Sequence, residues 1–360
     1  MTTIAVGGPA PYEVQIGVDA AAAVLAAVPE SATRVAVLAA PAVAAAAAGI
    51  AEQLQNAGWR VLGIELPDAE HAKTAEVAQR CWAALGDAGF TRSDVIVGFG
   101  GGATTDLAGF VAATWLRGIG IVQVPTTLAG MVDAAIGGKT GINTAAGKNL
   151  VGAFHPPLAV IVDPGFLSSL PRADLAAGMA EVVKAGFISD PVILDLIEGV
   201  PVTELTTSLE LLQQLIERAI AVKALVVSAD LKEQATGGVR REFLNYGHTL
   251  GHAIERVEDY RWRHGDAVSV GLVFAAALSR IGYGLDPAEE KRHRDILRSL
   301  DLPVGYPGHR WDDLLAAMRI DKKARGRTLR FVVLPALGAP DVVAVTDEGM
   351  LRQAYAEVAR

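Results

Sequence analysis

The segment from Arg241 to Asp266 holds the densest set of chemically active side chains in the chain. Three of the seven histidines lie here, at His248, His252 and His264. His248 and His252 are four residues apart, so on a helix they project from one face, and His264 follows at loop distance. Because imidazole is the commonest side-chain ligand for zinc, the rings could converge on one ion, and helix spacing alone favours His248 with His252 as the pair.

A metal held by two histidines needs a further ligand, and Glu181 is the candidate carboxylate. It lies with Lys184 in the otherwise apolar segment 178–184, where either charge would be costly to bury without a partner. Each histidine taken alone could equally be an ordinary polar residue on a helix face. Three of them with a suitable carboxylate favour a metal site.

A second group of polar residues follows a strand predicted at residues 94–99. The turn Gly100-Gly101-Gly102 leads into an apolar helix, and glycines at such a turn allow backbone N–H groups to approach a pyrophosphate. The G-x-G-x-x-A pattern alone is weak, because no acidic residue follows about 20 residues later, and a close-packed turn is the alternative. Segments 125–127 and 133–149 add hydroxyls, a carboxylate, lysines and amides among glycines. This composition is typical of a cofactor and substrate cleft.

The elements that must position these residues fall into two parts. Strands predicted at 34–39, 60–64 and 94–99 alternate with helices predicted at 43–57 and 74–88, after an antiparallel ribbon at 2–17. This is the βαβ pattern of a parallel sheet. From 174 to 318 the pattern is almost wholly helical, and a strand pair is expected at 329–334. We therefore predict an α/β domain, 1–170, and a mainly helical domain, 171–360.

Composition restricts the classes of protein that the chain can be. A length of 360 residues with 51% hydrophobic content suggests about two domains, and a net charge of −8 without a basic run argues against a nucleic-acid partner. The single cysteine, Cys81, excludes an intrachain disulfide and fits a reducing cytoplasm. The longest apolar run, 35–51, is mostly alanine and contains Pro41, so no membrane span is expected. We expect a soluble cytoplasmic protein.

Together these motifs resemble the 3-dehydroquinate synthase family of sugar phosphate cyclases, in order and over nearly the whole chain. The segments that carry the resemblance are Gly100-Gly101-Gly102 with Asp106, Thr126-Thr127, Gly137-Gly138-Lys139-Thr140-Gly141-Ile142-Asn143, Gly147-Lys148-Asn149, Glu181-Val182-Val183-Lys184, Leu244-Asn245-Tyr246-Gly247-His248 with Gly251-His252, and His264-Gly265.

The resemblance implies a Rossmann-like NAD-binding α/β domain, a helical metal-binding domain, an active site in the cleft between them, and a homodimer. The metal would be Zn²⁺, with Co²⁺ as an alternative. The reaction would convert 3-deoxy-D-arabino-heptulosonate 7-phosphate to 3-dehydroquinate and phosphate, in the second step of the shikimate pathway. It would proceed by transient oxidation by NAD, phosphate elimination, reduction and an intramolecular aldol closure, with NAD regenerated in each turnover.

The resemblance also assigns roles to individual residues. The metal ligands would be Glu181, His248 and His264, which makes His252 a substrate contact. Substrate-contacting and catalytic positions would be Asp133, Lys139, Asn149, Lys184, Lys223, Arg241, Asn245 and His252, with a further cation from Lys322 or Lys323. Cofactor contacts would be Glu70, Lys73, Gly101, Gly102, Asp106, Thr126, Thr127, Asp133, Lys139, Lys148, Phe166 and Ser169. Arg117 would reach the substrate site of the partner subunit; the alternative for it is a solvated charge at a helix end.

Other functions stay open at this point. A different sugar phosphate cyclase, making a valiolone or an inosose, would keep NAD and the metal but change the residues that hold the carboxylate, and Arg241 with Asn245 argues against it. A metal-dependent polyol dehydrogenase would release NADH. A non-catalytic binding protein with the same fold should lack at least one of the three metal ligands. The family pattern is altered after Asp230, where extra residues extend to Gly238.

Overall fold

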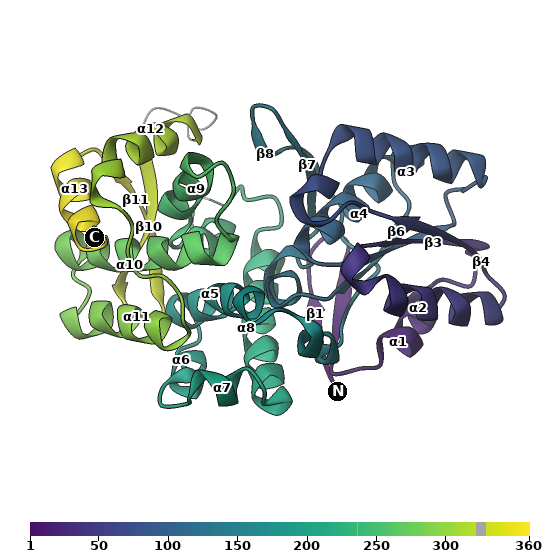
Figure 1. Ribbon diagram of the computed structural model, residues 1–360, viewed down its shortest axis with the longest axis horizontal. Coiled ribbons are helices and arrows are strands. Elements are labelled where there is room, and N and C mark those ends of the chain that lie inside the picture. The colour runs from purple at the N-terminus through teal and green to yellow at the C-terminus, as the bar shows by residue number, and fades with distance from the viewer. Residues whose placement is uncertain (236, 322–328) are drawn as a thin grey trace. The chain divides into compact units, whose positions relative to one another are not determined.

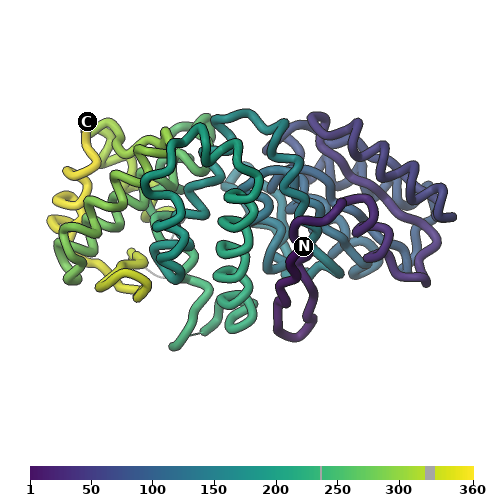
Figure 2. Tube along the Cα trace, turned by 90° about the horizontal axis from the view of Figure 1, so that it is seen from below, coloured from purple at the N-terminus to yellow at the C-terminus, as the bar shows by residue number. Residues whose placement is uncertain are grey.

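The computed structural model describes residues 1–235, 237–321 and 329–360. Contacts divide the chain into two units: unit 1 is Met1–Leu170 with Lys223–Lys232, and unit 2 is Pro171–Val222 with Glu233–Arg360. The short segment from the second half joins unit 1 beside the turn of the N-terminal ribbon, where the Gly7 N–H donates to Ser228 Oγ over 2.7 Å (Figure 2). The chain therefore leaves unit 1 near Pro171 and returns to it once.

Unit 1 is built on a seven-stranded sheet with the order β1-β2-β9-β6-β5-β3-β4. Its strands are β1 Thr2–Val6, β2 Tyr12–Ile16, β3 Arg34–Ala39, β4 Arg60–Glu65, β5 Val95–Gly100, β6 Gly120–Pro125 and β9 Ala159–Val162. Neighbouring strands are parallel except β1 and β2, which form the predicted antiparallel ribbon. The predicted strands at 34–39, 60–64 and 94–99 are confirmed.

Helices cover both faces of this sheet (Figure 1). They are α1 Ala20–Ala27, α2 Ala44–Asn56, α3 Ala75–Asp87 and α4 Gly102–Thr114. Val37 and Val97 point into one core with α1 and α2, whereas Leu38 and Ile96 point into the other with α3 and α4. Because side chains alternate along a strand, a sheet covered on both sides needs the continuous apolar runs that the sequence shows.

A hairpin of β7 (Lys139–Thr144) and β8 (Gly147–Phe154) forms a separate two-stranded sheet, in a segment for which the sequence analysis had predicted a cleft composition but no strands. Its glycines suit a turn, but here they allow close approach of the strands. A Cβ at Gly152 would lie 2.2 Å from the Thr140 carbonyl oxygen, and a Cβ at Gly141 would lie 2.9 Å from that of Val151. Such a requirement for space is visible only once the strands are paired.

Unit 2 is mainly helical, as predicted. Its elements are α5 Arg172–Ile188, α6 Val192–Ile197, α7 Val202–Leu205, most of α8 Leu209–Ala229, α9 His248–Val257, α10 His264–Tyr283, α11 Pro287–Ser299, α12 Trp311–Asp321, β10 Leu329–Ala336, β11 Ala339–Val345 and α13 Glu348–Ala356. The antiparallel pair β10 and β11 confirms the predicted strand pair.

Helix α10 is the central element of unit 2. It contacts α5, α9, α11, α13 and β10. By length and composition alone it could cross a membrane, but 78% of its most apolar window is buried inside the unit. Burial in the core of the unit therefore accounts for the apolar character of this helix. The sequence analysis had considered residues 35–51 instead as the longest apolar run, and had rejected them as a membrane span.

A fully buried histidine joins several elements of this core. His293 on α11 is 0% exposed; its ring stacks on Phe187 of α5, and its Nε2 lies 2.9 Å from the Tyr246 hydroxyl. Its Nδ1 lies 2.7 Å from the Glu289 carbonyl oxygen, so Nδ1 carries the proton and Nε2 accepts from Tyr246. Burial, with the nearby Arg292 guanidinium, lowers the pKa of His293 to about 3, although the bond to the Glu289 carbonyl opposes the change.

We predict that His293 makes the protein less stable in mild acid. Its pKa is depressed from about 6.5 in the unfolded chain, so its contribution is complete above pH 6.5 and is lost as the pH falls toward 3. Between pH 7 and pH 5 the loss should be about 2 kcal/mol. Urea unfolding at pH 7, 6 and 5 measures it, and His293→Gln, which does not titrate, should lack this share of the pH dependence. If the free energy of unfolding depended on pH equally in the two proteins, the prediction would be contradicted.

Candidate metal centre and cofactor site

Three potential metal ligands meet in unit 2, each from a different helix. Glu181 lies within α5, His248 begins α9 and His264 begins α10. Glu181 Oε1 lies 3.3 Å from His248 Nε2 and 3.3 Å from His264 Nε2. Ligands about 2.0 Å from a tetrahedral zinc ion stand about 3.3 Å from one another, so the separations suit such an ion.

The state of Glu181 also fits a cation. Its side chain is 3% exposed, and Oε1 makes no hydrogen bond with the described residues, which is costly for a buried carboxylate oxygen. The other oxygen, Oε2, is paired with the Lys184 ammonium. Burial would raise the pKa of Glu181, but Lys184 and the His248 imidazole hold it well below its usual range. The carboxylate is therefore ionised, with one oxygen available to a metal.

Neighbouring groups orient the His248 ring and change the pKa of His264. His248 Nδ1 lies 3.0 Å from the Tyr246 carbonyl oxygen, which leaves Nε2 facing Glu181. Burial opposes protonation of His264, but Glu181 and Glu255 raise its pKa to about 10. A divalent cation binds the deprotonated ring nitrogen, so it would replace a proton here.

Close helix packing brings the three ligands together. A Cβ at Gly265 would lie 1.8 Å from the Ala177 carbonyl oxygen, and a Cβ at Gly271 would lie 1.9 Å from that of Gly247. Gly247 itself has φ 78°, which favours glycine. These glycines let α10 approach both α5 and the start of α9. The spacing of the ligands thus depends on residues that are not ligands.

His252 takes a different position from the other two histidines. Its ring centroid lies 5.3 Å from that of His248 and 6.0 Å from that of His264, and its side chain is exposed. It groups with Glu255 and His264 rather than with Glu181. The two histidines four residues apart therefore do not both face Glu181, contrary to the expectation from helix spacing alone.

Further predicted contacts precede α9. Arg241 is buried and Asn245 partly buried on a 3₁₀ turn, Arg241–Asn245, which ends two residues before Gly247. The Asn245 amide donates to Glu233 Oε1 over 3.3 Å. Lys322 and Lys323, the candidates for a further cation, lie outside the described residues.

In unit 1 the glycine turn lies at the carboxyl end of the sheet. Gly101 and Gly102 join β5 to α4, and the Thr126 N–H donates to the Gly100 carbonyl oxygen over 2.9 Å. Because β5 and β6 are parallel neighbours, Thr126 and Thr127 come beside this turn. The N–H groups that begin α4 can therefore hold a pyrophosphate there.

A network of ionic and amide groups surrounds Lys73, whose side chain is 3% exposed. Its ammonium donates to Asp106 Oδ2 over 2.6 Å and to Asn149 Oδ1 over 2.5 Å. Glu70 accepts from the Asn143 amide over 2.6 Å and lies 3.7 Å from the Lys148 ammonium. Burial raises the pKa of Asp106, and Lys73 opposes the change. Five predicted cofactor and substrate residues are thus held together with Asn143, which had been assigned no role.

The remaining predicted residues of unit 1 lie on several different elements. Lys223 donates to the Asp133 carbonyl oxygen over 2.7 Å and pairs with the Asp133 carboxylate, which lies on the π turn Gly130–Ala134. Such turns are frequent at functional sites. Phe166 packs edge-on against Phe99 at 5.3 Å, and the Ser169 hydroxyl donates to the Phe166 carbonyl oxygen. Lys139 begins β7 and is exposed.

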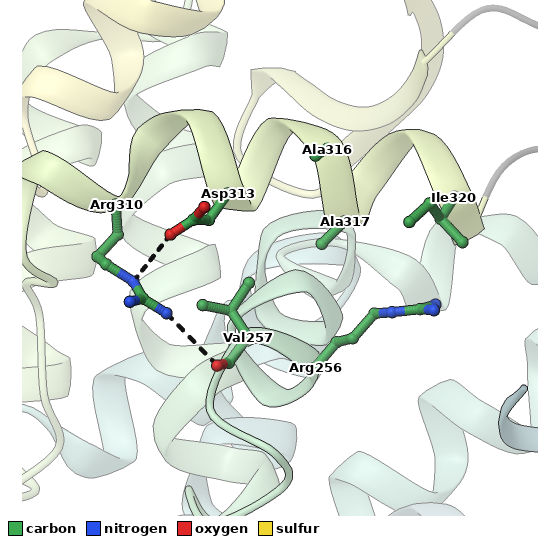
Figure 3. A pocket seen from close by; sticks show the side chains of 7 residues that line it. All are labelled: Arg256, Val257, Arg310, Asp313, Ala316, Ala317 and Ile320. Atoms are coloured by element: carbon green, nitrogen blue, oxygen red, sulfur yellow. Dashed lines mark hydrogen bonds and ion pairs between the residues drawn. The ribbon is translucent and has the colours of Figure 1, made fainter. Parts of the chain in front are cut away.

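A groove of about 380 Å³ elsewhere in unit 2 holds none of the predicted site residues (Figure 3). It lies beside α9 and α12, and Arg310 closes one end by binding Asp313 and the Val257 carbonyl oxygen, each over 3.4 Å. We assign it no part in the chemistry.

Sequence reasoning gave no role to Glu255 or Tyr246. The Glu255 carboxylate lies beside His264 Nδ1, and the Tyr246 carbonyl oxygen lies beside His248 Nδ1. Glu255 follows His248 by seven residues, a spacing that places both on one side of α9. That spacing was a usable indication. The role of the Tyr246 carbonyl is a backbone contact, which residue type does not reveal.

Comparison with known proteins identifies the relatives of the chain. Residues 63–177 match the family model described as 3-dehydroquinate synthase N-terminal, and residues 178–324 match its C-terminal counterpart. The chain is 56% identical to the 3-dehydroquinate synthase of Thermobifida fusca over 359 residues, covering 99% of this chain and 96% of that one.

Solved structures give a similar result for the fold. The 2-epi-5-epi-valiolone synthase of Streptomyces hygroscopicus, with NAD⁺ and Zn²⁺ bound, is 26% identical with a TM-score of 0.88, covering 99% of this chain and 98% of that one. A 2-deoxy-scyllo-inosose synthase complexed with carbaglucose-6-phosphate, NAD⁺ and Co²⁺ is 25% identical with a TM-score of 0.86, covering 99% and 100%.

Metal analysis of two variants distinguishes the roles of the histidines. We predict that His264→Ala loses zinc on dialysis, because a site with three protein ligands becomes one with two, whereas His252→Ala keeps zinc and loses turnover. Zinc content per chain is measured on both purified proteins, with the wild type as control. Zinc kept without His264 but lost without His252 would reverse the assignment.

Proposed function

The chain belongs to the 3-dehydroquinate synthase family, and from this we propose how the residues described above divide the work of its reaction. The enzyme converts 3-deoxy-D-arabino-heptulosonate 7-phosphate to 3-dehydroquinate and phosphate, in the second step of the shikimate pathway. It is a lyase that eliminates phosphate and closes a ring. The observation that carries the proposal is the convergence of Glu181, His248 and His264 in a chain of this family.

We propose that these three residues hold Zn²⁺, with Co²⁺ as a substitute. When bound, NAD supplies a hydride acceptor that returns the hydride later, and the metal supplies a Lewis acid for a substrate hydroxyl. The solved relatives that contain NAD⁺ with Zn²⁺ or Co²⁺ support this pairing. One carboxylate and two imidazoles leave coordination positions open for the substrate, as a catalytic metal site requires.

The substrate carries a phosphate and a carboxylate, and cationic side chains in an acidic protein are suited to both. We assign substrate contacts to the cationic side chains Lys139, Lys184, Lys223 and Arg241, and further contacts to His252, Asn149 and Asn245. Charge-assisted bonds from such groups fix the orientation of a substrate. Lys184 is paired with Glu181 and Lys223 with Asp133, so both ammonium groups are held in place beforehand.

For NAD we propose contacts from two groups in unit 1. Gly101, Gly102, Thr126 and Thr127 surround the amino end of α4 and would hold the pyrophosphate. Glu70 and Lys73 would contact the adenosine ribose. Further contacts would come from Asp106, Asp133, Lys139, Lys148, Phe166 and Ser169. The network around Lys73 supports this proposal, since it gathers several of these side chains into one place.

We propose that the enzyme acts as a homodimer in which Arg117 reaches the substrate site of the partner. Leu116 and Arg117 have φ values of 49° and 70°, which is strained for such side chains and is often kept where function requires it. Leu150, Val151 and Phe154 on β8 are 62%, 44% and 43% exposed. An exposed apolar strand at a sheet edge supports burial against a second copy.

We also propose a cytoplasmic location. Cys81 is buried, and burial raises its thiol pKa to about 11, so it is an inert core residue with no disulfide partner in the chain.

Phosphate and NADH measured together test the reaction. We predict one phosphate released per product with no accumulation of NADH, because a redox-neutral cyclisation uses one cofactor for oxidation and reduction. Incubation with the heptulosonate phosphate is followed by a phosphate assay and by absorbance of NADH, with substrate-free enzyme as control. Stoichiometric NADH would favour a polyol dehydrogenase instead.

Mixing inactive subunits tests the shared site. We predict that Arg117→Ala mixed with Lys184→Ala regains part of the wild-type activity, because one site of the hybrid contains neither substitution. Each variant alone is the control, and heterodimers are verified by two affinity tags. Heterodimers without recovered activity would contradict the role of Arg117 across the interface.

A further inference from the structure

A second buried carboxylate faces the other ring nitrogen of His264, and we propose that this residue, Glu255, positions His264 for the metal. The inference rests on the metal site proposed above. His264 Nδ1 lies 3.1 Å from Glu255 Oε2, while Nε2 lies 3.3 Å from Glu181 Oε1. The imidazole therefore lies between two carboxylates, one at each nitrogen.

This arrangement determines which nitrogen is available to the metal. A metal-bound imidazole keeps one N–H, and the nitrogen beside a carboxylate acceptor retains that proton. With a cation against Glu181 Oε1, the proton stays on Nδ1 and donates to Glu255, so that Nε2 can be the ligand. A carboxylate in this position fixes the rotation of the ring and makes the ligand nitrogen more basic.

His264 needs this restraint more than His248 does. The His264 side chain is 39% exposed, against 10% for His248, whose Nδ1 is held by the Tyr246 carbonyl. His264 also follows a loop in which Asp259 and Tyr260 adopt φ values of 51° and 58°. Glu255 is 3% exposed and lies on α9, the helix that His248 begins. It therefore ties the ligand at the start of α10 to the helix of the other histidine.

The same side chains could be interpreted as a second metal site, because His252, Glu255 and His264 also form a compact group. That site would need His264 Nδ1 as a ligand while Nε2 binds the first ion, so the ring would have to lose both protons. The Nδ1 to Oε2 distance of 3.1 Å is instead that of an ordinary N–H···O hydrogen bond. The geometry favours one ion per chain, with Glu255 acting through His264.

Zinc affinity without substrate or NAD provides the test. Glu255→Gln keeps the size of the side chain but removes its charge, and it should weaken zinc binding about 10–100-fold in competition with a coloured chelator. Glu258→Gln is the matched control, because Glu258 is near the end of α9 but accepts a hydrogen bond from Tyr306, not from His264. It should leave zinc affinity unchanged. Glu255→Asp keeps the charge and should recover part of the zinc affinity. If Glu255→Gln does not fold, the zinc affinity of Glu255→Asp is compared with that of the wild type instead.

Two further readouts separate positioning from general stability. The visible spectrum of the Co²⁺ protein should change in Glu255→Gln but not in Glu258→Gln, and the wild type should bind one ion per chain. Wild-type zinc affinity in the folded Glu255 variants would overturn the inference and leave the proposed function intact. Two ions in the wild type, with one lost in both Glu255→Gln and His252→Ala, would make Glu255 a ligand and also overturn it. A wild type that binds no divalent metal would refute both this inference and the proposed function.

Discussion

The structure of unit 2 depends on a carboxylate buried in an apolar helix. Glu181 is almost completely enclosed by α5 and its neighbours, and an isolated charge in such a place would cost several kcal/mol. A buried, ionised carboxylate of this kind requires compensating groups at both of its oxygens. Lys184 comes from the same helix, one turn later, but the two histidines come from the starts of α9 and α10. The need to compensate one charge therefore specifies where three helices must meet.

That meeting point is supported by packing that carries no charge. Gly265 and Gly271 let the backbones of α5, α9 and α10 approach closely, and a side chain at either position would collide with a carbonyl oxygen. Tyr246 contributes in two directions, since its carbonyl accepts from His248 while its hydroxyl is held by the buried His293. The ring of His293 in turn stacks on Phe187 of α5, the helix of Glu181. The ligand geometry is thus part of the core of unit 2, not an addition to its surface.

Unit 1 holds a buried charge in a related way. Lys73 is enclosed, and its ammonium is shared by Asp106 on α4 and Asn149 on the β7–β8 hairpin. Short hydrogen bonds from a buried ammonium group to such acceptors order the side chains that surround it. Because the hairpin is joined to the rest of unit 1 by these polar bonds and by the Asn143 N–H to the Lys73 carbonyl, its residues come beside the amino end of α4 through electrostatics as well as packing. The acidic chain therefore contains individual cations, each with its own hydrogen-bond acceptors, at the positions where anionic ligands are expected.

The sequence by itself determined the elements that follow from local pattern. The continuous apolar strands, the helices between them, and the change to a helical pattern after Pro171 all follow from residue periodicity, which local sterics and burial convert directly into structure. Residue types also indicated a metal site at the histidines and a phosphate site at the glycine turn. Periodicity could not decide which histidine faces Glu181, because helix spacing favours His252, while the position of His264 depends on contacts between α10 and α5. The hairpin at 139–154 and the role of Glu255 likewise depend on pairings across the chain. The family resemblance had named His264 among the ligands, but only the tertiary structure shows the physical reason, because each of these points depends on the distance between atoms that the sequence places far apart.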